Sequence, residues 1–368
     1  MKIALVHDFL VEYGGGEKVL EAFHEMWPKA PVFTAVYNKK LLKNWPDLKN
    51  WDVRVPGMTK IPLVSKVYKY FTFLYPLAIE NFDLREFDLI VSSSTFLAKG
   101  VLTRPGQIHL AYIHTPARFL YHLPTETSDK RSKWYWKILL GPIDFFLRIW
   151  DFNAAQRPDV LIANSETTAK RIRKFYNRVP VIINPPVDLT DRTYESHKSH
   201  ETSYFLSVSR LCAYKNVDLI IKAFNKLKLP LTVVGSGREE NALKSLAGET
   251  IKFTGFVTNE ELKSQYQNCR AFISAVSDED FGITPVEAMG YGKPVIAYRS
   301  GGVTETVVEG KTGIFFDDLS VDSLVKALSK FDPKKFTPEG CRKQAEKFDE
   351  ETFKKKIKKL VEDTVKIS

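Results

Sequence analysis

Short apolar runs of the kind that form buried strands alternate with helical patterns along almost the whole chain. Alternation of this kind predicts parallel sheets covered by helices on both faces. The fold class is therefore α/β, with two doubly wound, Rossmann-like domains in tandem, because 368 residues exceed one compact core. In such sheets ligands bind at the carboxyl ends of the strands, which we expect to face a central cleft. The predicted strands are Ile3–His7, Val32–Val36, Leu89–Ser92, His109–Ile113, Val160–Asn164 and Val181–Ile183 in the first series, and Tyr204–Val208, Leu231–Val234, Ile251–Phe253, Ala271–Ser274, Val295–Ala297 and Gly313–Phe315 in the second.

The two series are separated by Pro185-Pro186 and a polar run from Thr190 to Thr202 that has no periodicity. Such a stretch is typical of a linker. We therefore predict an N-terminal domain over 1–184, a linker over 185–202 and a C-terminal domain over 203–347. Residues 348–368 have apolar positions at helical spacing and are predicted to form a closing helix, which either ends the second domain or crosses back onto the first.

The segment from Glu279 to Glu287 places two carboxylates eight positions apart around a turn that contains Gly282. Thr284 is predicted to be a helix N-cap and Pro285 the first helical residue. The free amides of Gly282, Ile283 and Thr284 would then favour an anion, because unpaired donors and the helix dipole converge there. The carboxylates suit sugar hydroxyls, so the segment is typical of a nucleotide-sugar site.

A structural alternative exists for the same residues. Thr284 and Glu287 also form the pattern of a capping box, in which Glu287 bonds only the Thr284 amide.

Two cations follow the first strand of the second series, Arg210 in Ser209-Arg210-Leu211 and Lys215. At a strand end they would neutralise a diphosphate, and the alternative is a pair of surface cations. Phe256 and Val257 end another strand and could present a ring and backbone groups to a nucleobase, although core packing of Phe256 is an equal alternative.

The first series holds weaker candidates. Gly15 and Gly16 follow the first strand and open a helix, where glycine lets the backbone approach a ligand closely; a plain tight turn explains them equally well. His114 ends the His109–Ile113 strand, and it is either a site residue or a structural histidine.

The positive charge is concentrated in the first half, because residues 1–190 hold 26 Lys and Arg against 18 Asp and Glu. Lys60, Lys66 and Lys69 alternate with aromatic residues, and Arg131 and Lys133 precede a second aromatic stretch. Basic residues with aromatic neighbours suit an anionic membrane surface, so peripheral membrane contact is one hypothesis and a solvated basic face is the other. No recognised nucleic-acid motif accompanies the charge.

The composition favours a cytoplasmic protein. The three cysteines have neither metal-ligand nor redox spacing. The apolar start of the chain is too short for a signal peptide, and no stretch reaches the length of a membrane span.

Together these residues resemble the retaining glycosyltransferases of family 4, which have the GT-B fold. The E-x7-E motif of that family corresponds to Glu279 and Glu287, its glycine pair to Gly15-Gly16, and its arginine and lysine to Arg210 and Lys215. Its first-domain histidine corresponds to His114. Glu287-Ala288-Met289-Gly290 and Gly301-Gly302 are also family-like, whereas Asp280 departs from the glycine that the family more often has there.

The resemblance implies a role for each residue. Arg210, Lys215 and the amides of 282–284 would hold the donor diphosphate, with Phe281 in the same loop. Glu279 would position the transferred sugar, Glu287 the ribose, and Phe256-Val257 the base, while His114 would lie near the reacting carbon. The resemblance implies neither a metal nor another cofactor. It implies an acceptor that is a glycan or a lipid-linked sugar, bound by the first domain. A lipid-linked acceptor would place this cytoplasmic protein at the inner face of the plasma membrane. His114-Thr115-Pro116 and Asn184-Pro185-Pro186-Val187-Asp188 resemble motifs of mannosyltransferases of surface-polysaccharide assembly. By analogy with that family, the resemblance favours GDP-mannose as the donor.

Three alternatives remain at this point. A retaining glycosidase would also use two carboxylates, a nucleotide-sugar epimerase would bind the same donor, and a non-catalytic sensor would bind the donor without turnover. A UDP-sugar donor is equally compatible with these residues.

Overall fold

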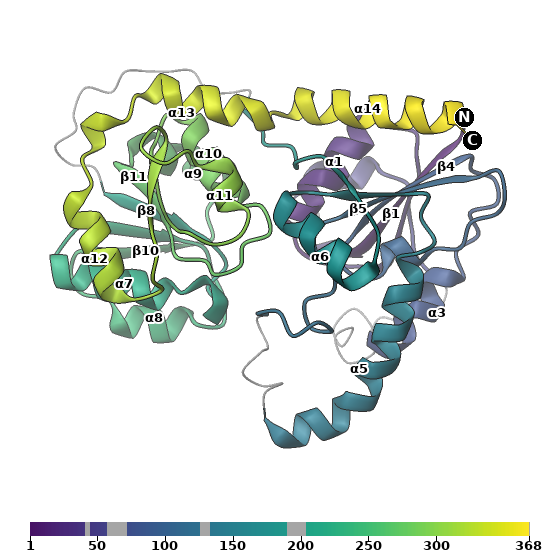
Figure 1. The fold of residues 1–368 in the computed structure, drawn as a ribbon, viewed down its shortest axis with the longest axis horizontal. Coiled ribbons are helices and arrows are strands. Elements are labelled where there is room, and N and C mark those ends of the chain that lie inside the picture. Colours follow the sequence, from purple (N-terminus) through teal and green to yellow (C-terminus); the bar gives the residue numbers. More distant parts are fainter. Residues whose placement is uncertain (41–44, 57–71, 126–132, 190–203, 368) are drawn as a thin grey trace. The chain divides into compact units, whose positions relative to one another are not determined.

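The computed structural model describes residues 1–40, 45–56, 72–125, 133–189 and 204–367. It divides into two compact units (Figure 1). The first comprises Met1–Leu123, Thr127–Pro186 and Glu351–Ser368, and the second comprises Pro124–Glu126 and Val187–Glu350. The polar run that was predicted as a linker lies almost entirely in 190–203, outside the described residues.

The first unit is built on a seven-stranded sheet in which every described pair of neighbouring strands is parallel. The order β3-β2-β1-β4-β5-β6-β7 is that of a doubly wound sheet, and its direction reverses between β1 and β4. The strands are β1 (Ile3–Leu10), β2 (Val32–Tyr37), β3 (Val53–Arg54), β4 (Leu89–Ser94), β5 (Ile108–Ile113), β6 (Val160–Ala163) and β7 (Val181–Ile182).

Helices cover both faces of this sheet. Along β1, Leu5 packs into one hydrophobic cluster, whereas Ala4 and Val6 pack into another. Successive side chains of a strand point to opposite faces, so each face of the sheet is buried under its own helices. The helices of the unit are α1 (Gly15–Met26), α3 (Tyr75–Glu80), α5 (Trp134–Ala154), α6 (Glu166–Tyr176) and α14 (Glu350–Ile367), with the short helices η2 (Pro46–Asn50), η5 (Thr72–Leu74) and η6 (Ala98–Gly100).

Helix α14 contributes to the core of the first unit although it lies at the far end of the sequence. Phe353, Ile357 and Val361 are buried in the same cluster as residues of β1 and α1. The Phe353 ring centroid lies 5.5 Å from that of Phe23 and 5.9 Å from that of Tyr112. The apolar residues at helical spacing in the tail therefore face the core of the N-terminal unit.

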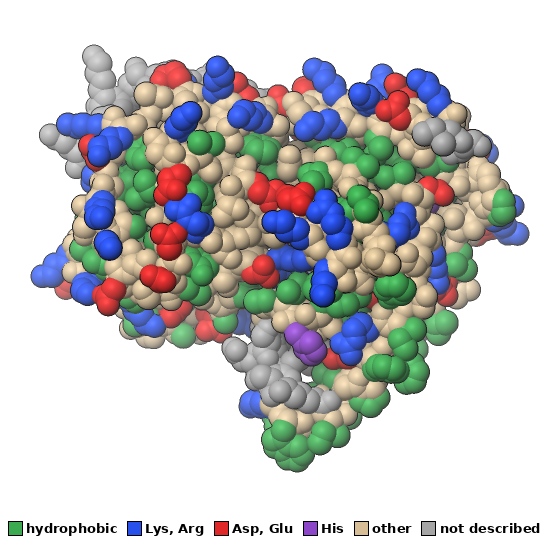
Figure 2. All heavy atoms as spheres, viewed as in Figure 1, with side chains coloured by type: hydrophobic (Ala, Val, Ile, Leu, Met, Phe, Trp, Pro, Cys, Tyr) green, Lys and Arg blue, Asp and Glu red, His purple; other side chains and the backbone are tan. Residues whose placement is uncertain are grey.

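Helix α5 is joined to the unit through its second half. Asp151 forms a buried ion pair with Lys99 at 2.6 Å, and Leu147 is buried. The Trp150 ring approaches Gly100 so closely that a Cβ there would lie 2.5 Å from it. Among the side chains that the structure describes between 134 and 146, none is buried, and hydrophobic side chains gather along the outer side and the end of this helix (Figure 2).

The second unit has a six-stranded parallel sheet in the order β10-β9-β8-β11-β12-β13. The direction of its strand order reverses between β8 and β11. The strands are β8 (Phe205–Val208), β9 (Leu231–Val234), β10 (Ile251–Gly255), β11 (Ala271–Ser274), β12 (Val295–Tyr298) and β13 (Gly313–Phe316), and the helices are η7 (Ala213–Lys215), α7 (Val217–Leu227), α8 (Glu240–Leu246), α9 (Asn259–Asn268), α10 (Ile283–Gly290), α11 (Val303–Thr306), α12 (Val321–Lys330), η8 (Pro333–Lys335), α13 (Pro338–Ala345) and η9 (Glu346–Phe348).

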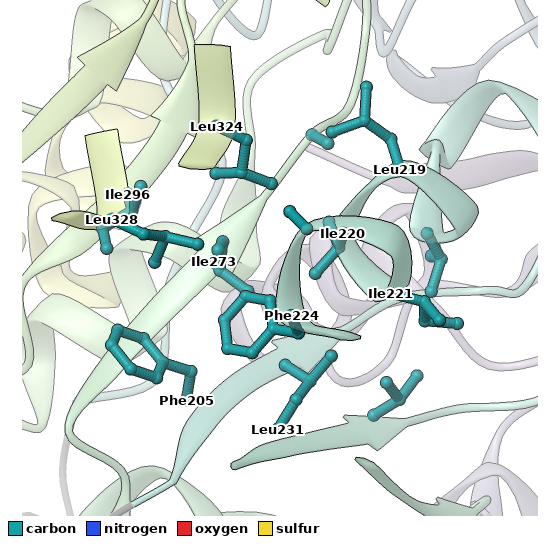
Figure 3. Close-up of a cluster of buried hydrophobic side chains, with 14 of the residues drawn as sticks. Phe205, Leu219, Ile220, Ile221, Phe224, Leu231, Ile273, Ile296, Leu324 and Leu328 are labelled. Carbon is teal, nitrogen blue, oxygen red and sulfur yellow. The ribbon is translucent and has the colours of Figure 1, made fainter. Parts of the chain in front are cut away.

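One face of this sheet packs against α7 and α12 (Figure 3). Phe224 of α7 and Leu324 of α12 are fully buried there against Phe205 and Ile273 of the sheet. The opposite face packs against α10 and α13 through Val286 and Cys341. Both faces are apolar, which explains why the strands appear in the sequence as continuous rather than alternating apolar runs.

The predicted fold class is confirmed, because both units are parallel α/β sheets. All twelve predicted strands are present, and their ends differ from the predicted positions by at most three residues. The two-residue strand β3 was not predicted, and β1 continues to Leu10 through His7 and Asp8, whose polar side chains suggested an earlier end.

We expect Phe353→Ala to lower the free energy of unfolding of the first unit by about 3–5 kcal/mol, because it removes a buried ring and leaves a cavity. Urea denaturation followed by circular dichroism measures this change. Lys359→Ala, an exposed change on the same helix, is the control and should alter stability by less than about 0.5 kcal/mol. Equal stability of the two variants would show that α14 is not part of this core.

Candidate functional site

The loops that follow β8 and β11 meet where the strand order of the second unit reverses. This is the position at which open parallel sheets bind ligands. The loop after β8 carries Arg210 and Lys215, and the loop after β11 carries Glu279. The fold therefore brings two neighbouring cations together with a carboxylate that lies more than 60 residues further along the sequence.

Lys215 and Glu279 form an ion pair with 3.0 Å between Nζ and Oε2. The side chains are 15% and 21% exposed. Burial alone would lower the pKa of Lys215, but the charge of Glu279, with a contribution from Tyr214, outweighs it and raises the pKa. Lys215 therefore carries its charge throughout the physiological range. The Tyr214 ring centroid lies 5.1 Å from Nζ, and Arg210 is exposed on the same loop.

Asn216 places Lys215 in this position. Its backbone is in the left-handed region, with a φ of 51°, which Asn tolerates better than most residues. Its side-chain amide donates to the carbonyls of Ala275 and Tyr214 at 2.9 and 3.2 Å. The first of these bonds ties the loop after β8 to the loop after β11.

Two glycines hold the Glu279 loop by close backbone packing. A Cβ on Gly301 would lie 2.2 Å from the Glu279 carbonyl oxygen, and one on Gly302 would lie 2.4 Å from the Phe281 Cα. The Gly302 amide donates to that Glu279 carbonyl at 2.8 Å. Gly301 also has a φ of 70°, so both its conformation and its surroundings require glycine.

Gly235 and Gly237 hold the Arg210 loop in the same way. Their Cβ atoms would lie 2.0 Å from the Ser209 carbonyl oxygen and 2.2 Å from that of Leu211. The Val234-Gly235-Ser236-Gly237 segment is thus a turn, as the sequence indicated, and it supports the strand end that carries Arg210.

The start of α10 differs from the prediction. The helix begins at Ile283, with Gly282 at the N-cap in the left-handed region at a φ of 89° and without a side-chain capping bond. Thr284 is therefore the second helical residue rather than the N-cap, and the capping-box alternative is wrong. The N–H groups of Gly282, Ile283 and Thr284 lie at the start of the helix, where no earlier carbonyl of the helix can accept from them. Pro285 has no N–H group.

Glu287 lies about one turn into α10 and is buried, with 8% exposure. Its Oε2 accepts a hydrogen bond of 2.8 Å from the hydroxyl of Tyr266. The Tyr266 ring stacks on Tyr291 with 5.4 Å between centroids. Tyr266 orients this carboxylate and was not predicted, because nothing in the sequence marks a tyrosine of α9 as a partner of α10.

The aromatic candidates separate into two kinds. Phe281 is buried, and its ring lies 5.4 Å from that of Phe348 in the core. Its side chain therefore packs the loop against the core, and the donor-binding role predicted for Phe281 stays a prediction. Phe256 is 71% exposed, so the core-packing alternative for it is wrong. Val257 is half-buried against the core.

The corresponding position of the first unit, where β1 and β4 meet, holds a chain of hydrogen-bonded side chains. His114 Nε2 lies 2.8 Å from Ser93 Oγ, which lies 3.1 Å from His7 Nδ1. His7 Nε2 in turn lies 3.4 Å from the Glu17 carboxylate. A Cβ on Gly16 would lie 3.6 Å from His114 Nε2, so the glycine turn of 14–16 passes close beside this histidine.

His7, Glu17 and Ser93 were missed by the sequence analysis. The only signal was His7-Asp8 at the end of an apolar strand. Asp8 has a separate task, since its buried carboxylate accepts the backbone amides of four consecutive residues, 95–98, at 2.6–2.9 Å. Burial would raise the pKa of Asp8, but these hydrogen bonds and the nearby cations lower it.

Most of the basic residues predicted to meet a membrane cannot be placed. Lys60, Lys66, Lys69 and Arg131 lie outside the described residues. Lys133 is exposed at the N-cap of α5, with Nζ 6.0 Å from the centroid of the Tyr135 ring. Within the part of the chain that the structure describes, no helix is long and apolar enough to cross a membrane, and no cluster of three or more His, Cys, Asp or Glu is arranged to hold a metal.

Two family models match the chain in succession. Residues 13–191 match Glycosyltransferase Family 4, and residues 191–348 match Glycosyl transferases group 1. Among solved structures, Anabaena HepE in complex with UDP has a TM-score of 0.69 at 19% identity and covers 99% of this chain and 100% of its own. The lipopolysaccharide outer core galactosyltransferase WaaB has a TM-score of 0.67 at 17% identity, with 99% and 100% covered.

Curated relatives agree with these matches. The alpha-1,3/1,6-mannosyltransferase ALG2 of Dictyostelium discoideum is 27% identical over 301 residues, which are 68% of this chain and 71% of the relative. A GDP-mannose-dependent phosphatidylinositol monomannoside mannosyltransferase of Mycolicibacterium smegmatis is 31% identical over 161 residues, 39% of this chain and 42% of the relative.

The two parallel α/β units and these matches define a glycosyltransferase. With the two family models extending together from residue 13 to residue 348, the chain belongs to the family 4 glycosyltransferases of the GT-B fold.

Gly301→Ala should reduce sugar transfer strongly, because the new Cβ clashes with the Glu279 carbonyl and displaces its loop. Gly310→Ala is a matched control, since Gly310 has a φ of 72° but no atom within 4 Å of its Cβ position. The control should lose only about 1–2 kcal/mol of stability from the left-handed backbone and keep its transfer rate. Initial rates and urea denaturation measure both effects. Parallel loss of rate in the two variants would contradict a role for this packing.

Ser93→Ala should lower the transfer rate, because it removes the hydroxyl that both His7 and His114 contact. Ser92→Ala is the control, since that buried serine bonds His109 instead, at 2.9 Å. Each change removes the serine hydroxyl that bonds a buried imidazole, that of His7 or that of His109, and should cost about 1–3 kcal/mol of stability. Steady-state kinetics would separate them: kcat should fall only in Ser93→Ala, and an equal kcat in both would show that the chain through Ser93 is purely structural.

Proposed function

We propose that the protein transfers a hexose from a nucleotide-sugar to a glycan or lipid-linked acceptor with retention of anomeric configuration. The observation that carries this proposal is the Lys215–Glu279 pair beside the first amides of α10, at the strand ends where a parallel sheet binds its ligand. Cations, amides and a carboxylate in one place suit a diphosphate joined to a sugar. A diphosphate alone would need no carboxylate.

In this proposal the second unit binds the donor. Arg210 and Lys215 neutralise the diphosphate, and the amides of 282–284 donate to its oxygens. Lys215 has three N–H donors, of which Glu279 receives one. Preorganised charge of this kind stabilises the diphosphate as it leaves, without reorganisation during the reaction.

Glu279 both positions Lys215 and accepts hydroxyls of the transferred sugar. Glu287, held by Tyr266, contacts the ribose, and Phe256 with Val257 contacts the base. The exposure of Phe256 supports its part, since a ring that packs in no core is available to stack on a nucleobase. His114 belongs to the first unit, which binds the acceptor.

The reaction needs no nucleophile from the enzyme. The acceptor hydroxyl attacks the anomeric carbon on the face from which the diphosphate departs, the bond to the diphosphate oxygen breaks, and that oxygen receives the hydroxyl proton. We propose that no metal takes part, because Arg210, Lys215 and the α10 amides supply the positive charge that a metal would otherwise supply.

We propose GDP-mannose as the donor, with surface polysaccharide or glycolipid assembly as the setting. The relatives named as mannosyltransferases, one of them GDP-mannose-dependent, support this choice. A UDP-sugar is the second candidate, because HepE binds UDP and UDP-glucose. Glycosidase, epimerase and sensor functions lose support, since the matched families are glycosyltransferases. A lipid-linked acceptor would place the protein at the inner face of the plasma membrane.

Thermal-shift measurements with GDP, UDP, ADP and their sugar conjugates test the proposal. The true donor, at 100 times its dissociation constant, should stabilise the protein by about 2.7 kcal/mol. Glu279→Gln should abolish transfer and keep the nucleoside diphosphate shift, whereas Glu287→Gln should reduce that shift while still accepting the Tyr266 hydroxyl. If no nucleotide shifts the melting temperature, or if both variants turn over normally, the proposal is wrong.

A further inference from the structure

Helix α5 presents an unusually apolar outer surface. Its large side chains Trp134, Tyr135, Ile138, Leu139, Phe145, Phe146, Ile149 and Phe152 are all at least 41% exposed, and Trp134, Ile138 and Phe146 exceed two thirds. At 3.6 residues per turn these positions form one continuous stripe, which we call the α5 stripe. The residues of α5 that pack against the unit, such as Leu147 and Ala154, lie on a different side of the helix.

A helix that is apolar on two sides is normally buried on both. Here the inner side is buried only in the second half of the helix. The α5 stripe is exposed along a helix of 21 residues, which is about 30 Å long. Contiguous apolar surface of this size marks an interaction site. Figure 2 shows the hydrophobic side chains gathered along α5.

An apolar groove enlarges the same surface. A pocket of about 320 Å³ opens beside the helix. It is lined by Phe145, Ile149 and Phe152 of the α5 stripe, by Tyr121 and Phe175, and by the polar residues Arg148 and Asn153 of α5. The Tyr121 and Phe175 rings are stacked with 4.3 Å between centroids. The groove therefore has an aromatic wall made of two stacked rings.

The chemistry of the α5 stripe favours lipid over protein as its occupant. A protein interface carries about one hydrogen bond per 100–200 Å², but among the large side chains of the stripe only the indole of Trp134 and the hydroxyl of Tyr135 can form hydrogen bonds, both at its N-terminal end. The exposed Asn153 at the other end donates its side-chain amide to the Ile149 carbonyl of the same helix at 2.9 Å. Aromatic residues with one polar atom sit at the headgroup level of a bilayer.

The charges around the α5 stripe agree with a lipid surface. Of the carboxylates of α5, Asp151 is buried in its ion pair with Lys99, and Asp144 is not on the stripe. Lys133 stands exposed at the N-terminal end, next to Trp134 and Tyr135. An apolar face rich in Trp and Phe, with cations at its border, is the composition of a helix that lies in the membrane interface.

We propose that α5 lies in the membrane interface, with its stripe inserted among the lipid chains and the adjoining groove occupied by one of them. The protein is thus bound to the bilayer by apolar insertion. This deepens the proposed function, because a lipid-linked acceptor would lie in the same membrane surface. Only the statement about the acceptor rests on the proposed function.

Vesicle flotation tests the proposal with the full chain. Wild-type protein should float with phosphatidylcholine vesicles containing 30% phosphatidylglycerol, and it should remain bound in 0.5 M NaCl, since apolar insertion is not screened by salt. Phe145→Glu/Phe146→Glu should bind at least about tenfold more weakly, because two inserted rings are replaced by charges. Both residues are exposed, so circular dichroism and the nucleotide thermal shift should be unchanged in this variant.

Val179→Glu is the matched control, as an 81% exposed apolar residue of the same unit outside α5, and it should bind vesicles like wild type. Three results would overturn the proposal: wild-type protein that does not float, a double variant that floats as well as wild type, or light scattering that shows a dimer which the double variant dissociates while neither form floats. None of these readouts needs turnover, so the membrane proposal and the transferase proposal can fail separately.

Discussion

The ion pair between Lys215 and Glu279 is the interaction on which the candidate site depends. It joins two residues that are 64 positions apart in the sequence, on the loops that follow β8 and β11. Its half-buried position strengthens the attraction beyond that of a surface pair. The pair also supports the role proposed for each residue. It keeps the lysine charged, so that the lysine can neutralise a diphosphate, and it holds the carboxylate where the sugar would lie.

Both units use the same means of positioning polar side chains. In each, residues at the carboxyl ends of central parallel strands meet where the strand order reverses. Glycines then allow neighbouring backbone to approach closely, as Gly301 does beside Glu279 and Gly16 beside His114. The helices on both faces bury the apolar strands, so polar functional side chains are found at the strand ends.

The sequence predicts the sheets well and the contacts less well. Strands such as Leu231–Val234 are buried on both faces, so an uninterrupted apolar run identifies them. Thr-Pro-x-Glu at 284–287 predicts an N-cap at Thr284, yet the helix begins after Gly282, whose left-handed backbone a glycine adopts without strain. The bonds of Ser93 to two histidines, and of Tyr266 to Glu287, depend on tertiary packing that no local pattern records. The spacing of the apolar residues in α5 likewise does not predict which side of the helix packs against the first unit.

The most direct test of the account is a crystal structure of the protein with GDP-mannose, or with UDP-glucose if the thermal shifts favour it. The account predicts that the diphosphate lies between Arg210, Lys215 and the amides of 282–284, with Glu279 on the sugar. A diphosphate bound elsewhere, or a donor complex in which Lys215 and Glu279 contact neither phosphate nor sugar, would contradict it.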